Sequence, residues 1–558
     1  MNHLQRHLEK YVFAIALIIL ITTSLISIFG VSREYWFDES FSLETVHMMN
    51  GGEKIVWQEH DVHPPVYYKL LAGWMALEPY KVAYEVPYER VNPLRTYESG
   101  WFGNMWLDES EWARLLSLLI AVVFFVGAYK ALSNIYGESG ASFAMLFMSI
   151  CSIYIHFATE TRMYILVLAF SAWALYCFTK VQEQISAGNS AYGWLAAGTI
   201  ICGLSVFTHY YSAIMLPFFF MFLLLTLWRK EDLKNLFVHL GVMTIIGIGF
   251  VLSAFMIYAA PQLERGEGMW FQPPALSSLP SAISYAFVNP DYIPFMDTMS
   301  VLFIVFMAWL IWFAYLQVRK VWKGGMQQEE KATFAFFLAI LYPFFVLGIL
   351  PLLGDGEGFT NLYHHRFFLC ITWLIAASWF VSLHRLVVSR HKIATLVMGL
   401  VTVSLGFMLL MMWVYAPYEL KHTFEYIPCG GVTVMHESPF SALPAIIYDR
   451  ERSCYNRHVI STQLSKSRRN TAGYDAFADE NVFVNMQLPL GELYYVRAQG
   501  KIVFDDDVFV WNGESLEGTL MTVIYQDDGV GLVKFNSTGN ETYTLKSYDS
   551  IVGYRLVN

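Results

Sequence analysis

The chain has 558 residues, of which 15% are charged and 56% are hydrophobic. Because soluble globular chains carry about 25% charged residues, this composition excludes an ordinary soluble enzyme and indicates a helical protein that crosses a membrane several times. The formal net charge of −10 argues against a nucleic-acid binder, since such proteins concentrate positive charge.

Apolar stretches of about 20 residues predict eleven membrane crossings within residues 1–416. The first, Tyr11–Val31, follows Arg6 and Lys10 and lacks a small-residue cleavage pattern. We interpret it as a retained signal anchor that leaves the N-terminus in the cytoplasm. The others are predicted at Trp112–Leu132, Gly140–Ala158, Tyr164–Val181, Gly193–Thr208, Tyr211–Trp228, Leu236–Ala259, Thr298–Val318, Ala332–Leu353, Phe367–Leu386 and Ile393–Ala416.

The distribution of basic residues supports this count, because lysine and arginine concentrate in cytoplasmic loops. The segments assigned to the cytoplasm hold 14 basic residues against seven acidic ones. The first exterior loop, 32–111, holds six basic residues against 14 acidic ones, and the tail, 417–558, holds 12 against 18. An odd number of crossings places the tail outside with the first loop, in a multi-pass protein of the plasma membrane or of an equivalent internal membrane.

The tail 417–558 has shorter apolar runs than the membrane part, and we expect it to form a small soluble domain of the α/β or mostly β class. Its clearest helix is Pro439–Asp449. Cys429 and Cys454 are the only cysteines of the tail, so they form either a disulfide, in an oxidising compartment, or two free thiols. Strands are predicted at Gly431–Met435, Lys501–Phe504, Val508–Trp511, Met521–Tyr525 and Val530–Phe535.

Two adjacent carboxylates, Asp38 and Glu39, follow the first crossing within a few residues. Carboxylates at a membrane surface are costly unless they are solvated, paired or used. Asp38 is suited to accept a proton from an acceptor hydroxyl or amine, provided that it lies within hydrogen-bond reach. An ordinary solvated acidic loop is the alternative.

A second motif of the same loop is His63-Pro-Pro, which continues into Tyr67 and Tyr68. The two prolines restrict the backbone and favour a helix start, so His63 is held on a stiff corner. The following stretch is amphipathic, as in helices that lie along a membrane surface. A purely structural turn is the alternative for this motif.

Short exterior turns carry further polar groups. Glu160 and Arg162 lie in the turn after the third crossing. They either neutralise each other, or Arg162 binds a phosphate in a bidentate manner. The later turns contain His209 with Tyr210, and His365 with Arg366. Such groups suit an anion or a metal, and interfacial anchoring is the alternative for the histidines.

In order and spacing, these motifs resemble those of the GT-C glycosyltransferases of the protein-mannosyltransferase and aminoarabinose-transferase type. The resemblance covers about residues 1–416. It rests on Phe37-Asp38-Glu39, His63-Pro-Pro-Val-Tyr-Tyr, Glu160-Thr-Arg162-Met-Tyr164, Trp270-Phe-Gln-Pro-Pro and His365-Arg366-Phe367.

The resemblance implies a GT-C membrane domain and an enzyme that moves a monosaccharide from a polyprenyl-phosphate carrier to an exterior glycan, lipid or protein acceptor, with inversion. It assigns to Asp38 the role of base or of part of a site that organises the acceptor, with Glu39, His63 and Glu160 as neighbouring catalytic groups. Some relatives bind a divalent metal and others do not, so the histidines leave metal dependence open. The substrate contacts implied are Tyr67, Arg162, Tyr164, His209, Tyr210, His365 and Arg366.

The alternative function is a transporter or flippase for a lipid-linked or polar solute, with the exterior motifs as its gate. Transporters show inverted repeats or broken polar helices near the membrane midplane, and neither pattern is clear in this sequence. A catalytically silent scaffold is a third reading, against which the intact Asp38 argues.

Overall fold

A computed structural model describes residues 3–30, 37–50, 63–77, 107, 109–227, 233–260, 287, 328–338, 369–389 and 392–414, together with short stretches between 427 and 557. Residues before 415 are almost entirely helical where they are described. Strands occur only after residue 430 in the described part. The mainly helical fold class expected from composition is confirmed.

Six of the described helical segments are long and apolar enough to cross a membrane, so the chain is an integral membrane protein. They are α1 (His3–Leu25) with η1 (Ile26–Gly30), α5 (Glu109–Met148), α7 (Tyr164–Ser186), η2 (Tyr210–Ile214) with α9 (Met215–Leu227), α10 (Leu233–Ala254) with η3 (Phe255–Ala259), and α17 (Leu369–Val388). The other described helices of the same bundle are α8 (Tyr192–Val206), α14 (Gln328–Leu338) and α18 (Lys392–Val414).

Helix α5 covers most of two predicted crossings, and its backbone is not helical at Gly137, where φ is 80° and ψ is 164°. Glycine adopts a positive φ without steric cost, so the chain changes direction there. The predicted crossing Gly140–Ala158 is interrupted after Met148, and residues Ser152–Ala158 form a separate short helix, α6. The predicted crossing Thr298–Val318 lies outside the described residues.

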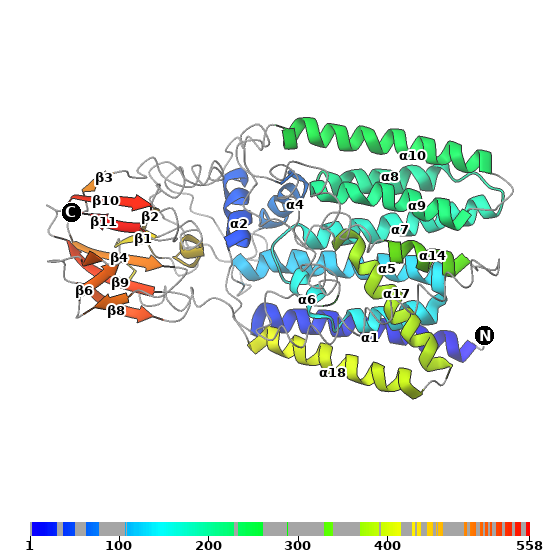
Figure 1. The fold of residues 1–558 in the computed structure, drawn as a ribbon, viewed down its shortest axis with the longest axis horizontal. Coiled ribbons are helices and arrows are strands. Elements are labelled where there is room, and N and C mark those ends of the chain that lie inside the picture. The colour runs from blue at the N-terminus through cyan, green and yellow to red at the C-terminus, as the bar shows by residue number, and fades with distance from the viewer. Residues whose placement is uncertain are drawn as a thin grey trace.

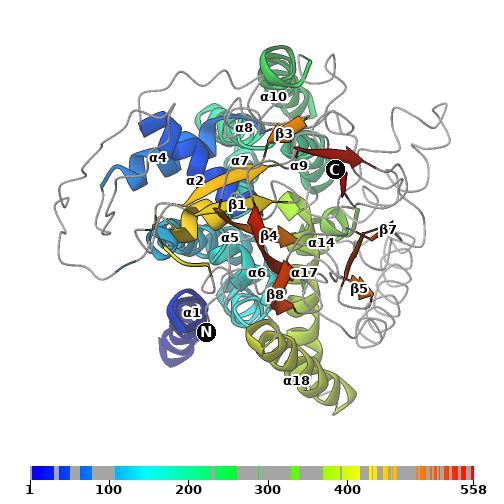
Figure 2. The same ribbon diagram turned by 90° about the vertical axis from the view of Figure 1, so that its left-hand side faces the viewer.

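The core of the bundle surrounds α5, which packs against α1, α7 and α17. Phe124 of α5 meets Trp373 of α17 edge to face, with ring centroids 5.5 Å apart, and both side chains are fully buried. Helices α10 and α18 lie at opposite edges of the bundle (Figures 1 and 2). Large apolar side chains there are exposed, such as Ile245 at 74% and Val403 at 72%, as expected for surfaces that face lipid.

Two short helices come from residues 32–111 and pack against each other: α2 (Phe37–Asn50) and α4 (Val66–Met75). Figure 1 shows them at one end of the bundle, with the N-terminus at the opposite end. One face of α4 is buried, including Tyr67, Tyr68 and Leu71, whereas Lys69 and Leu70 are exposed. This pattern matches the amphipathic stretch expected after the His63-Pro-Pro motif.

The strands lie together beyond the end of the bundle that carries α2 (Figure 1). A five-stranded sheet has the order β2-β1-β4-β9-β8, with β1 parallel to β2 and β4 and the other pairs antiparallel. Two three-stranded sheets have the orders β11-β10-β3 and β5-β6-β7. The strands are β1 (Thr433–His436), β2 (Arg457–Ile460), β3 (Asn485–Gln487), β4 (Gly491–Arg497), β5 (Val503–Asp505), β6 (Val508–Trp511), β7 (Glu514–Ser515), β8 (Met521–Gln526), β9 (Gly531–Ser537), β10 (Thr542–Ser547) and β11 (Tyr554–Val557).

Each strand expected from the apolar runs overlaps one of β1, β5, β6, β8 and β9, and residues 444–449 of the predicted tail helix are helical. Sequence reasoning missed β4, although it lies at the centre of the largest sheet. Cys429 and Cys454 form a disulfide, with their Cα atoms 4.8 Å apart. This pairing decides between the two alternatives left open above.

Candidate functional site

Asp38 and Glu39 lie in the first turn of α2, where the helix dipole favours negative charge by about 0.3–1 kcal/mol. Their side chains point in different directions. The Asp38 side chain is 27% exposed, whereas the Glu39 side chain has no exposed surface. Adjacent carboxylates of the same helix therefore lie in unlike environments, and only Asp38 is open to a solute.

Arg162 joins α2, α4 and the turn before α7. Its Nη2 lies 3.5 Å from Oδ2 of Asp38, and its Nη1 donates to the Asp38 carbonyl at 3.3 Å. The same Nη1 lies 3.2 Å from both the Ser42 and the Tyr68 hydroxyl oxygens. The Arg162 side chain is only 3% exposed, so these contacts fix the start of α2 against the membrane helices.

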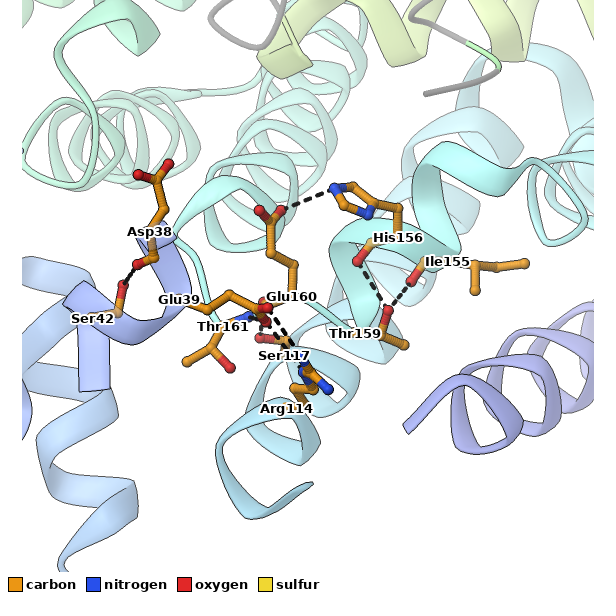
Figure 3. Close-up of polar contacts among 10 residues, drawn as sticks. All are labelled: Asp38, Glu39, Ser42, Arg114, Ser117, Ile155, His156, Thr159, Glu160 and Thr161. Atoms are coloured by element: carbon orange, nitrogen blue, oxygen red, sulfur yellow. Dashed lines mark hydrogen bonds and ion pairs between the residues drawn. The ribbon is translucent and has the colours of Figure 1, made fainter. Parts of the chain in front are cut away.

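Glu39 forms a buried ion pair with Arg114 of α5. Nε of Arg114 donates to Oε1 at 3.2 Å, and Nη2 donates to Oε2 at 3.0 Å. The backbone N–H of Thr161 also donates to Oε1, at 2.8 Å (Figure 3). Both carboxylate oxygens thus have charged or polar donors, which a buried carboxylate requires.

The turn that carries Glu160 and Arg162 is tied to α5, because the Ser117 hydroxyl donates to the Glu160 carbonyl at 2.6 Å. The Glu160 side chain is fully buried, and its Oε2 lies 3.3 Å from Nε2 of His156 in α6. Figure 3 shows the carboxylates of Asp38 and Glu160 on the same side of the site, whereas that of Glu39 points toward Arg114. His156 is therefore the basic residue beside Glu160, the third acid of the site after Asp38 and Glu39.

A cluster of rings surrounds His209, the residue before η2. The ring centroid of His209 lies 5.4 Å from that of His63, 5.8 Å from that of Tyr164 and 5.6 Å from that of Tyr211. A backbone hydrogen bond of 3.3 Å from Val66 to the Phe207 carbonyl holds the start of α4 against the end of α8. Tyr210 is the first residue of η2, directly after His209.

Tyr67 is fully buried, and this burial raises the pKa of its hydroxyl well above the ordinary value of 10.0. The neighbouring Ser117 hydroxyl and Arg162 guanidinium offset only part of that effect. Tyr67 consequently stays protonated at physiological pH. It is suited to donate a hydrogen bond and unsuited to act as a base.

Comparison with known proteins supports a fold assignment. The family model for dolichyl-phosphate-mannose-protein mannosyltransferase matches residues 101–256. The oligosaccharyltransferase AglB of Archaeoglobus fulgidus, in complex with an inhibitory peptide and a dolichol-phosphate, superposes with a TM-score of 0.50 at 10% identity, over 88% of this chain and 70% of AglB. ArnT of Cupriavidus metallidurans, bound to undecaprenyl phosphate, gives a TM-score of 0.50 at 11% identity, over 93% of this chain and 97% of ArnT.

The chain has the GT-C glycosyltransferase fold. The resemblance that the motifs suggested is thereby confirmed at the level of fold. No curated protein matches the sequence significantly.

The GT-C fold brings most of the predicted site residues together. Asp38 meets Arg162, and the ring cluster begins two residues further on, at Tyr164. Five further predicted residues lie in the same region, as their contacts show: Glu39, His63, Tyr67, Glu160 and His209. His365 and Arg366 lie outside the described residues, so their place in the site stays a prediction.

Sequence reasoning missed three polar residues that α5 and α6 contribute to the site: Arg114, Ser117 and His156. All three lie within predicted crossings, and two of them are ionisable. An ionisable residue inside a membrane segment is itself a sign of function or pairing. That signal identifies Arg114 and His156, whereas Ser117 has none, because serine is ordinary in membrane helices.

The described residues do not fit a metal centre. No cluster of three or more histidine, cysteine, aspartate or glutamate side chains with suitable geometry occurs among them. Both carboxylate oxygens of Glu39 already accept hydrogen bonds from Arg114 and Thr161.

Proposed function

We propose that this protein is an integral-membrane glycosyltransferase that moves a monosaccharide from a polyprenyl-phosphate carrier to an acceptor on the exterior face. The fold supports this proposal, because both solved structures reported above are of transferases, one with a bound dolichol-phosphate and the other with bound undecaprenyl phosphate. The same two structures suggest the donor class. A peptide is bound in one of them, so a protein acceptor stands beside a glycan or a lipid.

One observation supports the assignment of the base. Of the three acids at the site, Asp38 has 27% of its side chain exposed, whereas Glu39 and Glu160 have none. A general base must come within hydrogen-bond distance of the proton that it removes. Partial exposure leaves Asp38 open to an acceptor, and we infer that the two buried acids hold its surroundings.

The proposed reaction is a single displacement. The acceptor hydroxyl or amine gives its proton to Asp38 as its lone pair forms a bond to the anomeric carbon. The bond between that carbon and the phosphate oxygen breaks, and its electron pair leaves with the polyprenyl phosphate. Attack opposite to the leaving group inverts the anomeric configuration.

Arg162 has a different role in this proposal from the phosphate contact that the motifs suggested. Its guanidinium is 3% exposed and is directed at Asp38, Ser42 and Tyr68. We infer that it orients Asp38. Charge on the departing phosphate then requires other donors, for which His365 and Arg366 remain the expected residues.

We propose that the chain crosses the membrane eleven times, with residues 417–558 as an exterior α/β domain and the N-terminus in the cytoplasm. The Cys429–Cys454 disulfide supports an oxidising compartment for the tail. The strands lie at the end of the bundle that carries α2, which supports the same side for the tail and the site (Figure 1).

The proposed base is tested by Asp38→Asn in membranes supplied with radiolabelled polyprenyl-phosphate sugars. The amide keeps the size of the side chain and cannot accept a proton, so we expect transfer to fall at least about 100-fold, the lower range for a positioned general base. Glu183→Gln, a change of the exposed partner of Lys180, is the matched control. Undiminished transfer by Asp38→Asn would remove that residue from its role.

A further inference from the structure

Helix α2 has a second polar attachment to α5 that lies away from the site. His47 near the end of α2 hydrogen-bonds through Nε2 to Oε1 of Glu109, the first residue of α5. The Glu109 side chain is 3% exposed and the His47 side chain 21%. This pair is therefore largely buried, like the Glu39–Arg114 pair at the other end of α2.

The two attachments are well separated along both helices. Residues 39 and 47 are eight positions apart, which corresponds to about 12 Å of α-helix, and residues 109 and 114 are about 7.5 Å apart. A helix held at one point is free to pivot, whereas two points define its direction. Asn50 adds a weaker contact to the Ala72 carbonyl of α4, at 3.4 Å.

Among the described residues, few charged groups surround the second attachment. Glu44, one turn before His47 on α2, is a second acidic residue that interacts electrostatically with Glu109. Helix α4 contributes only one charged residue, Lys69, and its side chain is exposed.

We propose that His47 and Glu109 are positioning residues for the transfer reaction, acting on Asp38 through the direction of α2. The inference rests on the proposed function. Glu39–Arg114 fixes the start of the helix, and His47–Glu109 fixes its far end, so that Asp38 meets the acceptor at one angle. Neither His47 nor Glu109 touches a substrate in this role.

The expected effect is on turnover more than on donor binding. Misplacement of a reacting group by about 1 Å lowers the rate by up to about 100-fold. We expect His47→Ala to lower kcat by about 10-fold to 100-fold, with the KM for the donor changed by less than about threefold. A residue that only stabilises the fold would lower the amount of active protein and leave kcat per folded molecule unchanged.

The test uses the purified full-length protein in lipid nanodiscs, with a polyprenyl-phosphate sugar as donor. The variants are His47→Ala, Glu109→Gln and the exchange His47→Glu with Glu109→His. This double variant keeps a histidine–glutamate pair with the two residues swapped, so we expect it to regain at least about a third of the lost kcat. Arg385→Gln, which breaks the exposed Arg385–Glu329 ion pair between α17 and α14, is the matched control.

Hydrogen exchange of the α2 amides, residues 37–50, supplies a readout that needs no substrate. We expect faster exchange there in His47→Ala and unchanged exchange in α7. Three results would each overturn the inference: unchanged hydrogen exchange of the α2 amides in His47→Ala, an unchanged kcat in that variant, or a double variant His47→Glu with Glu109→His that is as inactive as His47→Ala. Absence of transfer in the wild type with every donor tested would instead overturn the proposed function, and the exchange data would still report whether the pair holds α2.

Discussion

The acids of the site differ in what surrounds them. Asp38 is partly exposed and lies against a guanidinium, whereas Glu39 and Glu160 are enclosed and lie against a guanidinium and an imidazole, respectively. A buried carboxylate that has both oxygens occupied cannot also serve a substrate. Exposure therefore separates the proposed base from the side chains that define the geometry around it.

The Glu39–Arg114 pair is expected to matter for stability before it matters for catalysis. Arg114→Gln leaves Glu39 buried without its charge partner, and such a loss costs about 3–5 kcal/mol. Thermal unfolding in detergent measures this cost. The double variant Glu39→Gln with Arg114→Gln buries no charge at this position and should recover part of the loss. An Arg114→Gln protein as stable as the wild type would contradict the assigned role.

The hydroxyl of Tyr67 gives a prediction about pH. Burial raises its pKa, so the group stays protonated in the folded protein to a higher pH than in the unfolded chain. Its contribution to stability is complete below the unfolded pKa and is lost only as the pH rises through the folded value, at strongly alkaline pH.

Tyr67→Phe should therefore leave the shape of the profile of kcat/KM against pH unchanged between about pH 6 and pH 9, a range below the ordinary tyrosine pKa. Measuring that profile for both proteins checks the assignment. Loss of a titration within this range in the variant would show that Tyr67 ionises during catalysis.

At the scale of elements, the site lies where α2, α4, α6 and the turn before α7 meet. Motif order predicts that Asp38, His63 and Arg162 lie on one side of the membrane, because the first two lie between the first and second predicted crossings and Arg162 between the third and fourth. It does not show which acid is enclosed, since Asp38 and Glu39 are neighbours of similar chemistry. That difference depends on Arg114, which comes from a stretch whose hydropathy identifies it only as part of a membrane helix.

Close packing of α8 against α10 gives a test of the bundle itself. A Cβ atom at Gly203 would lie 2.5 Å from the ring of Phe250, whereas one at Gly193, near the start of α8, would meet nothing within 4 Å. Gly203→Ala should therefore destabilise the protein by about 1–3 kcal/mol through overpacking. Gly193→Ala, the matched control, should be neutral or slightly stabilising. Equal unfolding temperatures for the two variants would contradict this packing.

At the scale of the whole molecule, each of the six described spans overlaps a crossing predicted from hydropathy, because a crossing needs a long apolar run. The break at Gly137 falls between two predicted crossings, whereas the break before α6 lies inside the predicted crossing Gly140–Ala158 and was not expected. In the tail, strand pairing depends on contacts between distant residues. The apolar run of β9 was recognisable, but its neighbour β4 carries charged residues at both ends and was missed.

The arrangement of the molecule also bears on the choice between enzyme and transporter. Helices α2 and α4, which carry Asp38 and Tyr67, lie at the end of the bundle on the side where the strands lie (Figure 1). A transporter places its binding site near the membrane midplane, between repeats. A transferase that uses a lipid-linked donor needs its polar groups at the surface, where the phosphate emerges from the bilayer.

The central claim is tested most directly by the fate of the carrier. Purified protein in liposomes is incubated with a panel of polyprenyl-phosphate-linked monosaccharides and candidate acceptors, and released polyprenyl phosphate is measured with the wild type and with Asp38→Asn. The account predicts that one donor yields polyprenyl phosphate and a glycosylated acceptor in equal amounts, with the wild type alone. Intact donor that crosses the bilayer without loss of its sugar, equally well with both proteins, would contradict it.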